Sequence, residues 1–535
     1  MDRLPIPAFL RDLGTEPAAF RALLVAALSL AAAGLNPPVT SPGLPNVQAV
    51  IRAQPEINAL LLLITLVAAG LLFVGGILGD TDGRRRILLG ALAMLCGANV
   101  LGLVVTSGPL FIADRLASGA AAYAVLPFAL ALVATSYQGV TRATAIGVAY
   151  AAYAGAAAVS PVLLTLMGPG GPTWPAFVVA SLAAAAALWF AWSRAPNLAA
   201  VARDDRQYVV ATAVWAFAIV IITAGVVDLG DRLGGGLRIG LVVIGLLMIG
   251  AYAVWDRRMR ARSDLRSHHV ERRPVTVAVA VGVIVSFAQA APMLQLPVFF
   301  YLVLGYGPLF ATIALAPLFV ALVVAGPVAG AMLSRFGPRT LVAGGLAAVG
   351  LGNMLVGAVL GRDTAYPALA LPLVLIGAGF VIATTVRTAI IFASVSRGLP
   401  ATAAALNEAS VIVGTRIGLA ALTALITQRS LDIYGSSLAD LDPGQRDTAV
   451  ASFRDVLVAI GTPDIRQIAA SLDPSDVSAY LAAFVQAYQQ SLVGTGLLAL
   501  LAAPVAWVAL GARDPLTTVW DHLDERAEAP ASTPA

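Results

Sequence analysis

Lysine is absent from this sequence, so all 33 basic residues are arginine. Without lysine, a phosphate-binding loop of the type G-x-x-x-x-G-K-[ST] cannot form, which argues against ATP-driven work by this chain alone. The single cysteine, Cys96, excludes a disulfide framework and a metal site built on cysteines. We find no constellation of nucleophile, metal ligands or cofactor ligands, so the sequence predicts neither an enzyme nor a bound cofactor or metal.

Charged residues are scarce as well. They make up 12% of the 535 residues, whereas roughly a quarter of the residues of a soluble protein are charged. Hydrophobic residues make up 59%, which predicts an all-α polytopic membrane protein surrounded by a lipid bilayer. The arginines form short clusters between apolar segments rather than one basic face, so we expect no nucleic-acid partner.

Apolar segments long enough to span a bilayer, about 20 residues each, recur about fourteen times. We place them at 18–40, 57–79, 86–106, 109–134, 143–167, 174–193, 207–229, 237–255, 274–303, 309–333, 338–360, 366–394, 402–428 and 486–511. Arginine-rich loops stay on the cytoplasmic side of a membrane. Their distribution therefore predicts that both termini lie in the cytoplasm. We expect the membrane to be the plasma (cell inner) membrane.

One long connection, residues 429–485, falls on the outer side in this topology. Asp442-Pro443 and Asp473-Pro474 each have the pattern of an N-cap followed by proline at the first helical position. We interpret the connection as a folded external hairpin. The alternative is a lid that contacts the substrate.

The stretch GGILGDTDGRRRILLG, residues 75–90, places five charges within seven residues between the second and third predicted spans. Its glycines allow a tight hairpin with close helix approach, and its arginines suit the lipid headgroup level. A weaker copy, GAMLSRFGPR, lies at 330–339, with Ser334 in place of the aspartate. We predict that both stretches are gating hairpins, formed by Gly76, Asp80, Gly83, Arg84, Arg85 and Arg86 and by Gly330, Gly337 and Arg339.

The pattern G-x-x-x-D-x-x-G-R-R-R resembles the loop signature of the major facilitator superfamily. Two copies, each between the second and third helix of a six-helix set, indicate a duplicated fold. Two six-helix sets account for twelve of the fourteen predicted helices, which leaves two. This layout is similar to the fourteen-helix drug:proton antiporter branch, which includes multidrug efflux proteins. The implied units are a six-helix bundle at 1–200, two inserted helices with a basic cytoplasmic linker at 201–273, and a six-helix bundle at 274–535 that includes the external loop 429–485 and a cytoplasmic tail.

Further segments carry the resemblance, and two depart from it. Arg115 and Gly119 match the family's R-x-x-x-G stretch, and Asn407 keeps a family position in ATAAALNEASVIVGTRIGLAAL. In LNPPVTSPGLP, however, Asn36 stands where this branch has an acidic residue. In GAAAVSPVLLT, Ser160-Pro161 alone remains of the antiporter motif, although its proline still favours a kink.

The resemblance implies a monomeric secondary transporter that exports hydrophobic or drug-like small molecules by alternating access, driven by protons. Two alternatives stay open. Carboxylates are scarce within the spans, and Arg387 and Arg416 lie near the midplane. Both features suit export of a lipid-like or anionic metabolite. The degraded motifs also permit a membrane scaffold or sensor, derived from a transporter, that does not transport.

Ionisable residues within the spans cost roughly 2.5 to 3.5 kcal/mol each, so each needs a partner or a use. No histidine lies in a predicted span, so a proton carrier must be a carboxylate, and Asp114 and Glu408 are the candidates. Arg115 stands at the family position associated with proton transfer; it either couples protons or bonds to helix carbonyls. Since neighbouring positions on a helix point to different faces, we predict that Asp114 and Arg115 are poor direct partners.

Arg387 and Glu408 each lie about ten residues from the hairpin near residue 398, at similar depth, so they can meet. They form either a static ion pair or a pair that opens when a proton or substrate reaches Glu408. Arg416 lies near the midplane with no obvious acidic partner, which suits an anionic or polar substrate group. We discount Asp228, because it lies at the outer end of a span, within reach of water.

Uncharged polar residues add to the predicted substrate cavity. Gln289 and Gln295 are flanked by Pro292 and Pro297, and disrupted helices are where transporters commonly bind substrate. Hydrogen bonding between helices is the alternative role of these glutamines. The predicted cavity residues are Asn36, Gln289, Gln295, Asn407 and Arg416.

Overall fold

The computed structural model describes residues 12–37, 83–105, 108–166, 174–195, 272–394, 400–459 and 473–511, with isolated positions between 218 and 254. Within these ranges every regular element is a helix and none is a strand, as the composition predicts. The predicted span 57–79 lies outside the described residues. The spans 207–229 and 237–255 are described only at isolated positions.

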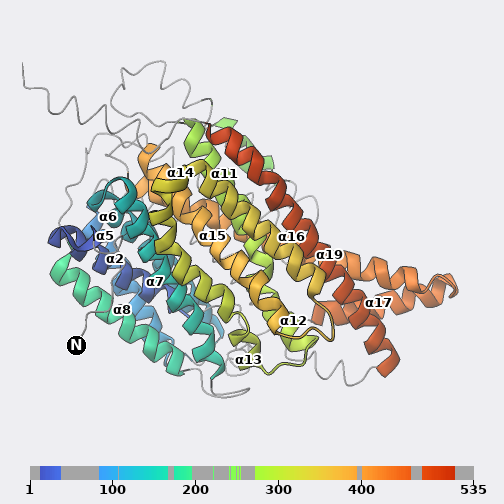
Figure 1. The fold of residues 1–535 in the computed structure, drawn as a ribbon. Helices are drawn as coiled ribbons and strands as arrows, with labels where there is room; N and C mark the ends of the chain where they lie inside the picture. The colour runs from blue at the N-terminus through green and yellow to red at the C-terminus, as the bar shows by residue number, and fades with distance from the viewer. Residues whose placement is uncertain are drawn as a thin grey trace, which may run out of the picture.

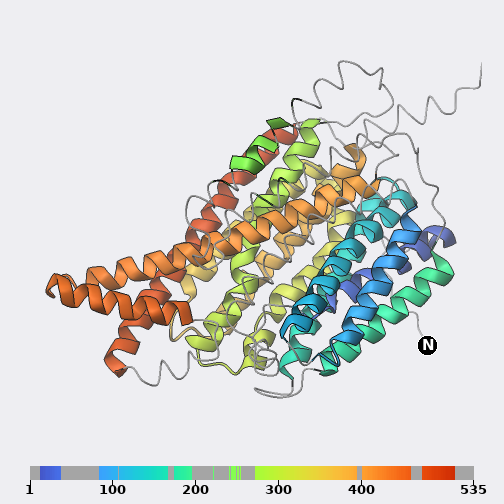
Figure 2. The same ribbon diagram turned by 180° about the vertical axis from the view of Figure 1, so that it is seen from behind.

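The helices fall into two groups along the chain. The first helix group contains α2 (Pro17–Gly34), α5 (Arg84–Leu101), α6 (Gly108–Ser136), α7 (Gly139–Thr165) and α8 (Trp174–Arg194), after the short η1 (Asp12–Gly14). The second helix group contains α11 (Arg272–Leu294), α12 (Leu296–Leu302), α13 (Pro308–Ile313), α14 (Ala316–Val359), α15 (Pro367–Ser394), α16 (Pro400–Ser437), α17 (Pro443–Ala459) and α19 (Pro474–Leu510). The two groups lie side by side, the first in blue to cyan and the second in green to red (Figures 1 and 2).

Nine helices of the described ranges are long and apolar enough to cross a membrane, which makes the chain an integral membrane protein. One of the nine, Leu309–Val359, covers two of the predicted spans. The total of fourteen spans stays a prediction, as do the proposed boundaries of the two bundles and the inserted pair.

Two helices depart from their predicted course. The single span expected at 274–303 is interrupted at Gln295, between α11 and α12, near Pro292 and Pro297. The spans expected at 309–333 and 338–360 lie within one element, α14, apart from the first residues of the former in α13. Within α14 the chain turns at Gly337, whose φ of 71° is in the left-handed region that favours glycine.

The end of α16 and helix α17 extend beyond the other helices, and the first part of α19 crosses this extension, as Figures 1 and 2 show. This extension covers the predicted external hairpin, and α17 and α19 begin at Pro443 and Pro474 as expected. It has its own small core, in which Phe453 stacks on Tyr480 at 4.4 Å between ring centroids and Tyr434 meets Phe453 edge-on at 5.1 Å.

The two groups meet where α7 crosses α14 and α15 and where α6 meets α16. At the crossing of α7 and α14, a Cβ atom added to Gly147 would overlap the carbonyl oxygen of Gly326. A Cβ on Gly330 would likewise overlap the backbone of Thr144. Glycine is required at these positions because the two backbones are in direct contact, as at close helix crossings in membranes.

Candidate functional site

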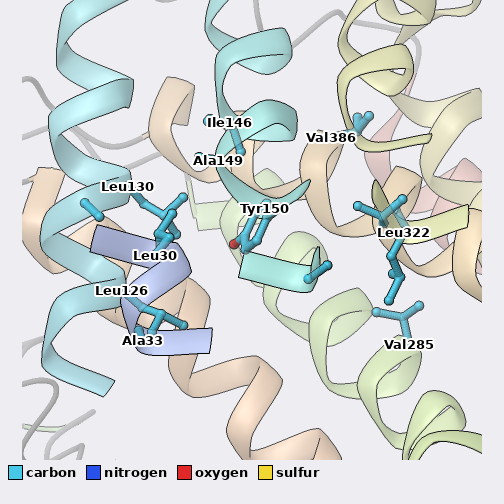
Figure 3. Packing of buried hydrophobic residues seen from close by; sticks show 14 of the residues in the cluster. Leu30, Ala33, Leu126, Leu130, Ile146, Ala149, Tyr150, Val285, Leu322 and Val386 are labelled. Carbon is cyan, nitrogen blue, oxygen red and sulfur yellow. The ribbon is translucent and has the colours of Figure 1, made fainter. Parts of the chain in front are cut away.

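A buried carboxylate lies where the two helix groups meet. Glu408 of α16 is 3% exposed, and its Oε1 accepts hydrogen bonds of 2.8 Å from the Tyr150 hydroxyl and from Asn407 Nδ2. Tyr150 belongs to α7 in the first group, whereas Asn407 and Glu408 belong to the second. Figure 3 shows Tyr150 between Leu30 and Leu126 on one side and residues of the second group on the other. The bond from Tyr150 therefore crosses the boundary between the groups.

Two further contacts close this cluster. Asn407 Nδ2 also donates to the Tyr150 oxygen at 2.8 Å, and its Oδ1 accepts from the Thr388 hydroxyl at 2.8 Å. The hydroxyl oxygen of Thr388, on α15, lies 3.3 Å from the hydroxyl oxygen of Tyr150. Residues Tyr150, Thr388, Asn407 and Glu408 are called the Glu408 network below. All four are buried, so the network is shielded from water and its hydrogen bonds are strong.

Arg387 of α15 is completely buried beside the Glu408 network. Its Nη1 donates to Ser410 Oγ at 3.0 Å, and Ser410 in turn donates to the Asn407 carbonyl at 2.6 Å. In the described part of the chain Arg387 and Glu408 form no direct ion pair within 4 Å. The structure thus brings the two predicted partners into one neighbourhood, but Ser410 and Asn407 link them, and the directly bonded form of the pair is not present.

Space for the Arg387 side chain comes from a glycine on α11. A Cβ on Gly282 would lie 2.6 Å from Arg387 Nη1 and 2.8 Å from its Cζ. The guanidinium therefore lies against the α11 backbone. Any larger residue at position 282 would displace it.

The prediction for Asp114 and Arg115 was wrong. Asp114 Oδ2 accepts bonds from Arg115 Nε at 2.8 Å and Nη2 at 2.6 Å, and both side chains are buried. The argument from helix faces holds for short side chains, but the arginine stem is long enough to bring its guanidinium back to the preceding residue. Pairing is strongly favoured here because burial lowers the local dielectric constant.

The rest of the Arg115 guanidinium links three helices. Its Nη1 donates to the Pro37 carbonyl at 3.2 Å, just after α2, and its Cζ lies 4.8 Å from the centre of the Phe177 ring of α8. Asn36, which replaces an acidic residue of the family pattern, is adjacent to Pro37. Ser160 of α7 donates to the Leu35 carbonyl at 3.0 Å. The departure at Asn36 and the remnant Ser160-Pro161 therefore lie close to the Asp114–Arg115 pair.

Of the predicted cavity residues, Arg416 and Gln295 have partners on other helices. Arg416 of α16 is half-buried, and its Nη2 lies 3.4 Å from the Tyr123 hydroxyl of α6. Gln295 donates to the Thr423 hydroxyl of α16 at 2.8 Å, which fits the alternative role of bonding between helices. Gln289 is buried on α11.

The predicted gating hairpins are described in part. Gly76 and Asp80 lie outside the described residues. Gly83 has a φ of 101° and is followed at once by α5, which starts at Arg84. Arg84 is buried and Arg86 exposed, while Arg85 donates to the Trp192 carbonyl of α8 at 2.6 Å.

The second copy of the hairpin motif lies at the bend of α14. Gly330 contacts Thr144 of the first group, as described above, and Arg339 lies over the Trp507 ring at 4.5 Å. Gly337 makes the turn itself. This hairpin therefore borders the crossing of α7 and α14.

Sequence reasoning missed four residues of these clusters: Tyr123, Tyr150, Thr388 and Ser410. A signal for the tyrosines was present, because a phenol in an alanine-rich span needs a hydrogen-bond partner in the absence of water. No sequence signal identifies Glu408 as the partner of Tyr150, since the two residues are 258 positions apart.

Comparison with known proteins gives consistent matches. Residues 19–418 match the sequence profile of the Major Facilitator Superfamily. The chain is 27% identical over 397 residues to the uncharacterized MFS-type transporter EfpA of Mycobacterium tuberculosis, covering 70% of each chain. It is 29% identical over 300 residues to the puromycin resistance protein pur8 of Streptomyces alboniger, covering 55% of this chain and 58% of that one. A shorter match, 39% over 88 residues, covers 16% of this chain and 18% of the cephamycin export protein CmcT of Amycolatopsis lactamdurans.

Solved structures agree on the fold. The human organic anion transporter MFSD10 matches with a TM-score of 0.55 and 15% identity, over 92% of this chain and 100% of that one. The proton:xylose symporter XylE matches with a TM-score of 0.56 and 13% identity, over 90% and 95%. At such identities the likeness concerns the fold alone.

Proposed function

Because the chain belongs to the major facilitator superfamily, a family of transporters rather than enzymes, we propose that it is a secondary active transporter that exports hydrophobic or drug-like molecules in exchange for protons. Transport itself follows from the family. Proton coupling, the direction and the substrate class are the parts proposed here.

The hydrogen bond between Tyr150 and Glu408 carries the proposal for proton coupling. Alternating access requires the two helix groups to separate on one side of the membrane and to close on the other. This bond joins α7 to α16 across the boundary between the groups. Any motion that separates α7 from α16 must therefore break it.

Protonation of Glu408 would weaken that bond. A hydrogen bond to a carboxylate contributes about 1.5–3 kcal/mol, whereas one between neutral groups contributes about 0.5–1.5 kcal/mol. A proton arriving at Glu408 thus lowers the cost of separating α7 from α16 by about 1 kcal/mol or more. Loss of the proton restores the stronger bond, so proton binding and release alternate with opening and closing.

The names of two relatives are consistent with export as the direction. One is called a cephamycin export protein and another a puromycin resistance protein. We extend this role to the present chain. We likewise propose that the protein acts as a monomer in the plasma membrane, with both termini in the cytoplasm.

The proposal is tested in liposomes that contain the purified protein and are loaded with hydrophobic dyes, one cationic and one anionic. Dye efflux and proton movement are recorded together in the wild type and in Glu408→Gln. Asp432→Asn is the matched control, because it removes an exposed carboxylate from the same helix.

We expect dye efflux that requires a pH gradient, is lost in Glu408→Gln and persists in Asp432→Asn. Efflux that proceeds without a gradient, or that survives in Glu408→Gln, would contradict proton coupling at this residue. A folded wild type that moves neither dye nor protons would favour the scaffold or sensor alternative.

A further inference from the structure

Two carboxylates are buried in the described part of the chain, Asp114 and Glu408, and both have partners. Asp114 accepts two bonds from Arg115. Glu408 is 3% exposed and accepts from Tyr150 and Asn407. In each carboxylate one oxygen is bonded in this way, and both side chains are almost completely buried, so neither is readily accessible to a cationic molecule between the helix groups.

Arg416 presents the opposite charge. It lies on the face of α16 that carries Ala405, Ala409 and Ile412, and Tyr123 of α6 packs against that face. Arg416 is half-buried. Among the described residues no carboxylate lies within 4 Å of its guanidinium. The apolar segment 57–79, outside the described residues, contains neither aspartate nor glutamate in its sequence.

The polar pair formed by Arg416 and Tyr123 has open space beside it. Gly119 lies one helical turn before Tyr123 on α6, on the same face. A Cβ on Gly119 would meet no atom within 4 Å, which contrasts with the glycines at the crossing of α7 and α14. A guanidinium has five N–H donors in a planar fork, and the bond to Tyr123 uses one of them.

From these contacts we propose that Arg416 and Tyr123 bind the anionic head group of an amphiphilic substrate in the open space beside Gly119. This assignment rests on the proposed transport function and names its substrate class. The head group is a carboxylate, sulfonate or phosphate, because these planar or tetrahedral oxyanions accept two parallel bonds from a guanidinium. A cation at this position would face an uncompensated positive charge.

Binding of two xanthene dyes with the same ring system tests the assignment. Sulforhodamine B carries sulfonates, and rhodamine 6G is a cation. The affinity of each dye for the purified full-length protein is measured by fluorescence polarisation. The variants are Arg416→Gln, Arg416→Lys and Tyr123→Phe, with Arg429→Gln as the control that removes an exposed arginine from the same helix.

We expect sulforhodamine B to bind more tightly than rhodamine 6G and to lose about 10- to 100-fold in affinity in Arg416→Gln, as for a lost charged hydrogen bond. Arg416→Lys should restore part of this loss, Tyr123→Phe should cause a smaller one, and Arg429→Gln should cause none. Equal binding of the two dyes, preference for the cation, no binding to the folded wild type, or an unchanged Arg416→Gln would each overturn the assignment.

A competition arm identifies the source of the head group. Displacement of sulforhodamine B by phosphatidylglycerol but not by phosphatidylcholine would indicate a lipid head group; displacement by neither would indicate a soluble anion. Both results support an anionic site. Efflux of sulforhodamine B that depends on Arg416 but not on a pH gradient would contradict the proton coupling proposed above while leaving the anionic site in place.

Discussion

The hydroxyl of Tyr150 lies 2.8 Å from the carboxylate of Glu408, although the two residues are 258 positions apart in the chain. One belongs to α7 and the other to α16, so a single hydrogen bond connects the two helix groups. Asn407 and Thr388 hold both atoms in place through bonds of their own.

Removing the Tyr150 hydroxyl should loosen this connection. In Tyr150→Phe, Glu408 loses one of its two donors, and we expect the contact between α7 and α16 to weaken by about 1.5–3 kcal/mol. Proton-driven dye efflux in liposomes should fall about tenfold or more, with the protein still folded. Tyr488→Phe, which removes a buried phenol hydroxyl of α19 that has no hydrogen-bond partner among the described residues, is the control and should retain normal efflux. Equal efflux in the two variants would contradict a special role for Tyr150.

The close crossing of α7 and α14 at Gly147 and Gly326 gives a second prediction. A methyl group on Gly147 has no room beside the Gly326 carbonyl, so Gly147→Ala should separate α7 from α14 at a cost of about 1–3 kcal/mol. The measurement is the rate of thiol labelling at Thr144→Cys, in a background where Cys96 is replaced by alanine. We expect labelling to become about tenfold faster.

The control for this experiment is Gly155→Ala on the same helix. There the new methyl group would lie 3.5 Å from Val323 Cγ2, an ordinary contact, so labelling should stay at the wild-type rate. Equally fast labelling in both variants, or no change in Gly147→Ala, would show that close backbone contact does not hold the groups together.

Breaking the ion pair of α6 should destabilise the first helix group. Asp114→Asn leaves the buried Arg115 charge without its carboxylate, at a cost of about 3–5 kcal/mol. Thermal unfolding in detergent should show a clear fall in Tm. Ser118→Ala, one turn away, removes a neutral hydroxyl that donates to the Arg115 carbonyl at 3.3 Å and should cost only about 1 kcal/mol. Similar falls in the two variants would rule out a stabilising pair.

The extension formed by α16, α17 and α19 gives a fourth prediction. Phe453→Ala removes the ring that packs on Tyr434 and Tyr480, at a local cost of about 3–5 kcal/mol. Limited proteolysis should then cut within α17, while the exposed control Arg454→Ala should resist. Normal efflux in Phe453→Ala would fit a structural hairpin. Loss of efflux would favour a lid that contacts the substrate.

The sequence predicts helices well where a bilayer sets their length. The span expected at 174–193 corresponds to α8, which the structure ends at Arg194. The prediction fails where a helix continues past its apolar segment, because hydropathy does not register a polar helical turn. Thus α16 runs nine residues beyond the span expected at 402–428, and α19 begins twelve residues before the one expected at 486–511.

The candidate site could likewise be predicted only in part from the sequence. Glu408 and Arg387 stand out in the sequence because charges are rare in apolar segments. Tyr150 does not, since its partner depends on how α7 packs against the second helix group. The pairing of Asp114 with Arg115 was missed for a different reason. Helical spacing gives the direction in which a side chain leaves the helix, but the length of the arginine side chain determines where its guanidinium lies.

The length of α16 has a consequence for observing the protein at work. From Glu408 to Ser437 the helix has no internal proline and runs for roughly 44 Å at 1.5 Å per residue. A rigid rod of that length turns a tilt of about 10° near Glu408 into a displacement of about 8 Å at its tip. The extension thus amplifies a small tilt, and two fluorophores, one at its tip and one on the first helix group, would report each turnover as a change in the distance between them.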